Sequence, residues 1–180
     1  MSEPHVVVIM GVAGAGKTTV GRTLADTLHW PFYDADDFHS ADNVARMRAG
    51  TPLTDADRAP WLEALNRRIA DTLHAGSSAV LACSALRRIY RAALVPVGAA
   101  PDAVRFVHLR TAQDVLSRRL ARRRAHYATV SLLPSQLATL EEPGEDERAL
   151  ILDGARSAPE LVAEIMRSLG DPIPLPRATR

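Results

Sequence analysis

Residues 11–18 read Gly11-Val12-Ala13-Gly14-Ala15-Gly16-Lys17-Thr18, which matches the spacing G-x-x-x-x-G-K-[ST] without a mismatch. An apolar run, Val6 to Met10, precedes this stretch, and a helical pattern follows it. In that context the backbone amides of the loop surround nucleotide phosphates, the lysine reaches the β- and γ-phosphates, and the hydroxyl binds Mg²⁺. We therefore predict that residues 11–19 bind a nucleoside triphosphate, with Thr18 as a metal ligand and Thr19 beside it.

Lys17 is the only lysine in the chain, and all the other basic side chains, of 22 in total, are arginines. An arginine-rich composition needs no functional explanation, but a single retained lysine does. A compact ammonium group sits between two phosphates as a point charge, where a planar guanidinium fits poorly. We therefore predict a catalytic role for Lys17.

The composition is that of one ordinary globular domain: 180 residues, 47% hydrophobic and 24% charged, with a formal net charge of +1. That charge gives no reason to expect nucleic acid or an anionic membrane as a partner. The apolar stretches are far shorter than a membrane span, and residues 1–10 lack the features of a signal peptide. The single cysteine, Cys83, lies in an apolar run and is interpreted as a small buried side chain. We expect a cytoplasmic protein.

Short apolar runs alternate with longer amphipathic segments along the chain, which predicts an α/β fold with a five-stranded parallel sheet flanked by helices. The predicted strands are Val6–Met10, Pro31–Tyr33, Ala79–Cys83, Val104–Leu109 and Leu150–Leu152. The predicted helices cover about 17–29, 41–49, 57–75, 86–94, 112–124 and 158–169.

Residues 1–170 are expected to form one domain with two additions to the alternating pattern. Residues 40–75 are long for a single crossover and indicate an inserted helical pair. Residues 125–147 contain Pro134, Pro143 and an acidic stretch, fit neither a core strand nor one buried helix, and are interpreted as a mobile excursion over the site. The tail, residues 171–180, holds three prolines and is expected to be disordered.

Acidic residues follow the second predicted strand, in the run Tyr33-Asp34-Ala35-Asp36-Asp37-Phe38-His39. In an open parallel sheet, ligands gather beyond the carboxyl ends of the strands. We expect Asp34 and Asp36, two residues apart, to point the same way on a strand continuation. Asp36 would then accept the proton of a substrate hydroxyl, and Asp34 would contact Mg²⁺ through water. The alternative is a helix N-cap and a solvated turn, where aspartate is common.

Basic residues follow the third predicted strand and recur later in the chain. Ser84 and Arg88 belong to a corner that suits an anion or a hydroxyl-rich ligand, although a solvated basic face is the alternative. Arg119 and Arg123 are four residues apart and share one helix face, so that one could stack on adenine and the other neutralise the transferring phosphoryl group. A nucleic-acid patch is the other interpretation of this run, but no aromatic residues are interleaved with it.

Taken together, the chain resembles the gluconokinases of the small P-loop kinase type, which are similar in fold to shikimate kinases. The likeness extends to about residue 170 and rests on five segments in matching order: GVAGAGKTT (11–19), FYDADDFH (32–39), GTPLTDADRAPWL (50–62), VLACSALRRIYR (80–91) and AHYATVSLLPSQLATLEEP (125–143). The resemblance implies transfer of the γ-phosphoryl group of ATP to the 6-hydroxyl of D-gluconate, with ATP and Mg²⁺ as cofactors. It also suggests a homodimer.

Carried over position by position, the resemblance implies a site for the sugar acid and a lid. Asp36 would hold the reacting hydroxyl and Arg58 the carboxylate, since arginine pairs with a carboxylate through two parallel hydrogen bonds. Residues 120–140 would form the lid, with Arg123 catalytic. Further substrate-binding residues would be His39, Ser84, Arg88 and His126, and Arg156 would border adenine.

This chain departs from the family pattern at three places: Ser40 replaces a proline, Thr54 replaces an asparagine, and Ala125-His126-Tyr127 replaces Gly-His-Phe. The first two lie near the expected sugar site and leave the substrate open. A shikimate kinase or another small-metabolite kinase is therefore an alternative, although Ser84-Ala85 stands where shikimate kinases carry two glycines. A nucleotide-dependent switch or a nucleic-acid-handling module is a further alternative.

Overall fold

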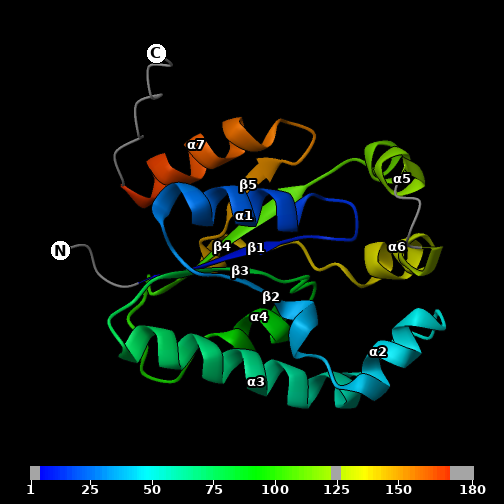
Figure 1. Cartoon of the computed structure of the whole chain (residues 1–180), viewed down its shortest axis with the longest axis horizontal. Helices are drawn as coiled ribbons and strands as arrows, with labels where there is room; N and C mark the ends of the chain where they lie inside the picture. The colour runs from blue at the N-terminus through cyan, green and yellow to red at the C-terminus, as the bar shows by residue number, and fades with distance from the viewer. Residues whose placement is uncertain (1–4, 123–126, 171–180) are drawn as a thin grey trace.

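The computed structural model describes residues 5–122 and 127–170, with the side chains of 127–131 excepted. Five parallel strands form one sheet in the order β2-β3-β1-β4-β5, with helices on both faces (Figure 1). The strands are β1 (Val6–Met10), β2 (Phe32–Asp34), β3 (Ala79–Ala82), β4 (Val104–Arg110) and β5 (Leu150–Asp153). The α/β class and the five predicted strands are confirmed.

The central strand β1 is buried along its whole length because helices cover both faces of the sheet. Its side chains alternate between two apolar clusters, as the twofold period of a strand requires. Val7 and Ile9 belong to the cluster under α1 and α7, whereas Val8 and Met10 belong to the cluster under α3 and α4. This double burial explains why the run from Val6 to Met10 has no polar positions.

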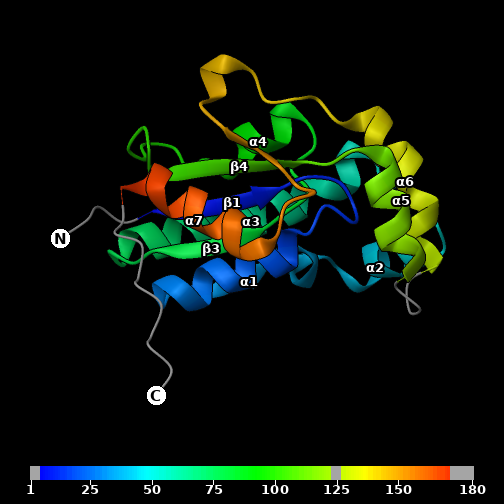
Figure 2. The ribbon, with the colours of Figure 1, turned by 90° about the horizontal axis from the view of Figure 1, so that it is seen from above.

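The helices match most of the predicted segments. Seven α-helices are described: α1 (Lys17–Leu28), α2 (Ala41–Arg48), α3 (Asp55–His74), α4 (Arg88–Leu94), α5 (Gln113–Arg122), α6 (Tyr127–Thr139) and α7 (Ala158–Leu169). Two 3₁₀ turns, η1 (Ala35–Phe38) and η2 (Glu145–Glu147), complete the described elements. The expected helical pair over 40–75 is present as α2 and α3. Figures 1 and 2 show α5 and α6 side by side beyond the carboxyl ends of the strands.

Two expectations about local structure are wrong. Asp36 does not continue a strand, since β2 ends at Asp34 and η1 begins at the next residue. Residues 125–147, where no buried helix was expected, contain α6, which runs through Pro134. Leu133 of α6 is buried in the cluster under α1 and α7, and Leu137 packs against it, so tertiary packing stabilises this helix. The expectations for Arg123, His126 and the tail 171–180 lie outside the described residues.

A buried arginine fastens the segment after α6 to the rest of the fold. Arg91 of α4 is 1% exposed and donates two hydrogen bonds to the carboxylate of Glu147, at 2.6 and 2.9 Å. Its guanidinium also donates to the carbonyl oxygens of Ala85, Leu86 and Glu141, at 3.1, 3.2 and 2.9 Å. The cation therefore ties residues 141–147 to the corner that follows β3.

Replacing this arginine should destabilise the protein strongly. Arg91→Met leaves Glu147 and three carbonyl groups without their partner, and removing one member of a buried ion pair costs about 3–5 kcal/mol. Thermal unfolding followed by circular dichroism measures the effect. Arg118→Met is the control because it removes an exposed arginine paired with Asp114 on its own helix, and it should leave the midpoint nearly unchanged. Equal shifts for the two variants would contradict a structural role for the Arg91–Glu147 pair.

Candidate active site

The glycine-rich loop connects β1 to α1, so it lies at the carboxyl edge of the sheet. Gly11, Gly14 and Gly16 have φ angles of 143°, 84° and 101°, which L side chains rarely adopt. A Cβ atom at Gly11 would approach the carbonyl oxygen of Leu109 to 3.1 Å. The glycines are therefore required by the path of the loop, and helix α1 begins directly after it, at Lys17.

Hydrogen bonds within the loop hold its shape. The carbonyl oxygen of Val12 accepts from the amide of Ala15 at 3.2 Å and from Nζ of Lys17 at 3.1 Å. Arg119 of α5 donates to the carbonyl oxygens of Gly14 and Ala15, at 3.4 and 3.2 Å. These donors keep the carbonyl groups engaged, while helix α1 turns its N-terminal amides toward an incoming anion.

A hollow of about 310 Å³ lies beside the loop and suits the rest of a nucleotide. Its lining includes Arg119, Gly154 and Arg156, and also Arg122, which the sequence pattern did not single out. Arg156 is half-buried and paired with Glu164 of α7 at 2.5 Å. Two of the three predicted nucleotide-binding arginines therefore lie around one hollow, and the third, Arg123, is outside the described residues.

An oxygen-rich pair next to the loop fits a magnesium ion. The hydroxyl of Thr18 donates to a carboxylate oxygen of Asp34 at 3.2 Å, which brings the two predicted ligands together. Hydroxyl and carboxylate oxygens are the ligand types that Mg²⁺ prefers, and a nucleotide-bound ion takes further ligands from phosphates and water. In residues 5–122 and 127–170, no group of three or more His, Cys, Asp or Glu side chains could hold a metal ion.

The N-cap that was the alternative interpretation of the acidic run is present at Asp34, whereas its contact with Mg²⁺ stays a prediction. The other carboxylate oxygen of Asp34 accepts from the amide of Asp36 at 3.2 Å and caps η1. Because of this cap, the chain turns at Asp34 and places Asp36 in η1. There Asp36 is close enough to Lys17 for their charges to interact. The side chain of Asp36 is open to solvent, but surrounding protein atoms displace part of its water. This desolvation and the charge of Asp34 raise the pKa of Asp36, while Lys17 partly lowers it.

Trp61 and His39 form the wall behind the acidic turn. Nε1 of Trp61 donates to the carbonyl oxygen of Ala35 at 2.7 Å, which fastens η1 to α3. The ring of His39 stacks on Trp61 with centroids 4.4 Å apart. Burial and the nearby charge of Arg58 lower the pKa of His39 to about 4, so the imidazole is neutral at pH 7. A hollow of about 800 Å³ opens beside these rings, between α2 and α3.

Arg58 lies on the first turns of α3 and faces Tyr90 of α4. Its guanidinium donates to the carbonyl oxygen of Leu53 and to the hydroxyl of Tyr90, the latter at 3.4 Å. The guanidinium carbon lies 5.4 Å from the centre of the Tyr90 ring. Tyr90 in turn donates to Asp55, so the arginine is held in place by a small network.

The corner after β3 contacts the phosphate loop, and its predicted binding of an anion or a hydroxyl-rich ligand stays a prediction. Ser84 is half-buried, and its carbonyl oxygen accepts from the amide of Gly11 at 3.3 Å, which joins the corner to the phosphate loop. The guanidinium of Arg88 is turned toward Asp146 of η2 and is largely exposed. Its role as a substrate-binding residue stays a prediction. Cys83 is buried, as expected, and burial raises the pKa of its thiol to about 12.

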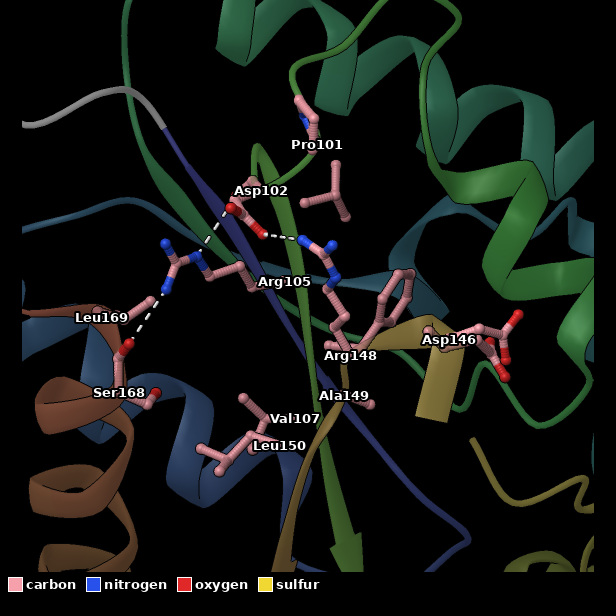
Figure 3. A pocket seen from close by; sticks show the side chains of 13 residues that line it. Pro101, Asp102, Arg105, Val107, Asp146, Arg148, Ala149, Leu150, Ser168 and Leu169 are labelled. Atoms are coloured by element: carbon pink, nitrogen blue, oxygen red, sulfur yellow. Dashed lines mark hydrogen bonds and ion pairs between the residues drawn. The ribbon is translucent and has the colours of Figure 1, made fainter. Parts of the chain in front are cut away.

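A third hollow, of about 610 Å³, lies at the opposite end of the sheet (Figure 3). Its two arginines, Arg105 and Arg148, are turned toward groups of the hollow itself. Arg105 donates to the carbonyl oxygens of Asp102 and Ser168 at 3.4 and 3.1 Å, and Arg148 lies 3.9 Å from the carboxylate of Asp102. Because it borders the amino-terminal ends of β4 and β5, it is remote from the phosphate loop.

Sequence reasoning missed three side chains that hold this site together. Trp61 supports the acidic turn, Tyr90 supports Arg58, and Gln136 of α6 accepts a hydrogen bond from the amide of Ala13 in the phosphate loop at 2.7 Å. Each acts on a residue that is distant in sequence. No local sequence pattern predicts such a contact, because buried aromatic residues and helical glutamines are common in proteins of many kinds.

Comparison with known proteins agrees with this geometry. A family model described as an AAA domain matches residues 6–143. A gluconokinase of Gluconobacter oxydans (strain 621H) is 45% identical over 169 residues, which cover 92% of this chain and 91% of that protein. The chain belongs to the gluconokinase family. It is accordingly an ATP-dependent kinase.

Solved structures agree with the assignment to the gluconokinase family. A sugar kinase from Janibacter sp. HTCC2649 is 40% identical with a TM-score of 0.85, covering 93% of this chain and 95% of that one. A gluconokinase from Sinorhizobium meliloti 1021 is 38% identical with a TM-score of 0.81, covering 94% of each chain. A shikimate kinase from Aquifex aeolicus, at 19% identity and a TM-score of 0.54, shares the fold alone. These likenesses favour the gluconokinase interpretation over the shikimate kinase alternative.

Among the helices that the structure describes, none combines the length and the apolar character needed to span a membrane.

Lys17→Ala should nearly abolish turnover in a protein that stays folded. We expect the ammonium group to neutralise charge on the phosphates during transfer, and the chain has no other lysine to replace it. Coupled measurement of ADP release gives kcat, and circular dichroism checks the fold. A folded variant with nearly normal kcat would show that the loop does not act as a phosphate-transfer site.

Proposed function

We propose that the protein transfers the γ-phosphoryl group of ATP to the 6-hydroxyl of D-gluconate, giving 6-phospho-D-gluconate and ADP. The observation that carries the proposal is the juxtaposition of Lys17, the Thr18–Asp34 pair and Asp36 at one edge of the sheet. A phosphate-binding loop, a magnesium pair and a carboxylate for the acceptor hydroxyl are the parts that phosphoryl transfer requires. The names of the relatives support gluconate as the acceptor.

Within this proposal the loop residues 11–19 bind the phosphates, and Thr18 and Asp34 hold the magnesium ion. When bound, Mg²⁺ neutralises charge that develops on the phosphate oxygens. Lys17 contributes a second positive charge from the protein. Arg119, which already contacts the loop, lies beside the hollow for the nucleoside.

Asp36 orients the 6-hydroxyl of the sugar acid and accepts its proton. Its carboxylate lies two residues after Asp34 and close enough to Lys17 for their charges to interact. Desolvation and the charge of Asp34 raise the pKa of Asp36, which makes it a stronger base than an ordinary aspartate. Its position beside the acceptor hydroxyl, more than this shift, is what makes it the proton acceptor in the proposal. The Trp61 contact to Ala35 keeps this carboxylate in position.

Arg58 binds the carboxylate at the other end of the sugar acid. The guanidinium of Arg58 lies over the ring of Tyr90 and donates from one nitrogen to the carbonyl oxygen of Leu53 and to the Tyr90 hydroxyl. These contacts hold it in a defined orientation. Such a preorganised group loses little freedom on binding. His39, neutral at pH 7, and Ser84 supply hydrogen-bonding groups for the hydroxyls between the two ends. We further propose that the enzyme is cytoplasmic and forms a homodimer, which light scattering in solution tests.

Asp36→Asn should lower kcat by about 10²–10⁴ while changing the KM values for ATP and gluconate far less. The amide preserves the shape and can still bond the sugar, but it cannot accept the hydroxyl proton. Because phosphoryl transfer has a loose transition state, positioning matters more than proton removal, and the lower end of this range is expected. The measurement is steady-state kinetics with each substrate varied in turn.

Asp34→Asn provides the matched comparison, because it changes a neighbouring carboxylate in the same way. This variant should show a raised Mg²⁺ requirement that excess metal partly restores. If excess Mg²⁺ fully restores Asp36→Asn, or if that variant has wild-type kcat, the proton acceptor lies elsewhere.

Arg58→Ala should raise the KM for gluconate about ten- to a hundredfold, the loss expected for one charge-assisted hydrogen bond. The KM for ATP should change little, because the phosphate loop and Arg58 belong to different elements. Initial rates over a grid of both substrate concentrations separate the two constants. An equal rise in both, with thermal destabilisation, would assign Arg58 a structural role instead.

The acceptor itself is tested by measuring ADP release with a panel of sugar acids, shikimate and nucleoside monophosphates. The proposal expects turnover with D-gluconate far above the rest, and a phosphate at the 6-position of the product by NMR. Preferred turnover of shikimate or a nucleotide would identify a different kinase, and nucleotide binding without turnover of any acceptor would indicate a switch.

A further inference from the structure

Helix α6 reaches the phosphate loop through the polar side chain of Gln136. The Oε1 atom of Gln136 accepts a hydrogen bond from the backbone amide of Ala13 at 2.7 Å, across 123 positions in sequence. Arg119 of the neighbouring helix α5 also bonds this loop through its side chain, as noted above. Gln136 bonds an amide, whereas Arg119 bonds carbonyl groups, so the two side chains contact opposite polar groups of the loop.

The amide that Gln136 binds belongs to a peptide unit held on both sides. The carbonyl oxygen of the same Val12–Ala13 unit accepts from the amide of Ala15 and from Nζ of Lys17. Rotation of this unit would break its bonds to Ala15, Lys17 and Gln136 together. The orientation of the peptide therefore determines where the lysine ammonium can anchor before nucleotide arrives.

Helix α6 is packed firmly enough to hold the Val12–Ala13 peptide in this orientation. Leu133, one turn before Gln136, is 5% exposed and belongs to the same apolar cluster as Val12 and Ala13. The carbonyl oxygen of Gln136 also accepts from the amide of Leu140 at 3.0 Å, which fixes the backbone of the last turn. The glutamine thus projects from a packed helix end toward a packed loop.

We propose that Gln136 is a positioning residue for nucleotide binding: it fixes the Val12–Ala13 peptide, and through it Lys17, in the orientation that receives the phosphates. Because the Ala13 amide is directed at α6, the later amides of the loop and of the α1 N-terminus serve the phosphates. A loop that is already ordered loses less freedom on binding. The inference concerns the nucleotide half of the site and goes beyond the proposed function, since it holds whichever acceptor the enzyme uses.

The test replaces Gln136 with methionine, which has a similar length and helix propensity but no comparable acceptor. Gln113→Met is the matched control, because the only other glutamine of the chain is exposed at the first residue of α5. Titration with a non-hydrolysable ATP analogue and Mg²⁺ measures affinity without any acceptor. Kd should rise about three- to tenfold for Gln136→Met, the effect of one lost hydrogen bond, and should not change for the control.

Two further readouts separate positioning from a general loss of stability. Amide hydrogen exchange at Ala13, followed by NMR in the nucleotide-free protein, should be faster in Gln136→Met while exchange in β1 stays unchanged. In turnover, the KM for ATP should rise and the KM for the acceptor should stay within twofold.

An unchanged Kd for Gln136→Met would overturn the inference. Tighter nucleotide binding would overturn it as well, because Gln136 would then be competing with a phosphate for the amide. If gluconate proves not to be the substrate, the titration still tests the role of Gln136, because it contains no acceptor.

Discussion

Parallel pairing of β1 with β3 on one side and β4 on the other is the constraint on which the rest of the structure depends. Parallel strands end at the same edge, so the segments that follow them meet there although they are far apart in sequence. The phosphate loop follows β1, the acidic turn follows β2, and the corner containing Ser84 follows β3. The site is thus a consequence of strand order, and each polar group reaches it at the end of a buried strand.

The residues at this edge are positioned by contacts of different chemical kinds. The Thr18–Asp34 contact joins the first two segments, and the backbone bond from Gly11 to Ser84 joins the first and third. Ion pairs then extend outward, from Arg91 to Glu147 and from Arg88 to Asp146. Of these two, the Arg91 pair is buried and the Arg88 pair is exposed. Only the first is therefore expected to contribute much to stability, since water screens exposed pairs.

The helices beyond the strand ends and the segment after α6 together contact both the phosphate loop and the corner after β3. Arg119 of α5 and Gln136 of α6 bond the loop that receives phosphates, while Glu141, which follows α6, accepts from the backbone of Arg88 at 2.7 Å. The segment after β4 is thereby in contact with both halves of the site. A change in the position of this segment would therefore alter its contacts with both the loop and the corner after β3.

Much of the fold and part of the site could be predicted from the sequence, because the signals are local. The run from Val6 to Met10 is apolar at every position, as a strand buried on both faces must be, and the spacing of Gly11, Gly16 and Lys17 suits one loop geometry. The acidic run predicted a cluster near Mg²⁺, but the strand continuation at Asp36 was wrong because the Asp34 cap starts a 3₁₀ turn. Helix α6 was missed because Pro134 and the absence of a clear amphipathic pattern concealed a helix that packing stabilises.

The sequence by itself therefore determined the class of fold and the glycine-rich loop, and it predicted which groups would carry the chemistry. Only the tertiary structure decided how these groups are held: Trp61 on the acidic turn, Tyr90 on Arg58, and Gln136 on Ala13. The physical reason is that a ligand such as a phosphate constrains residues that are neighbours in sequence, and these residues form a recognisable motif. A supporting hydrogen bond joins two segments that are far apart in sequence. Many different residue pairs can form such a bond, so no local pattern predicts it.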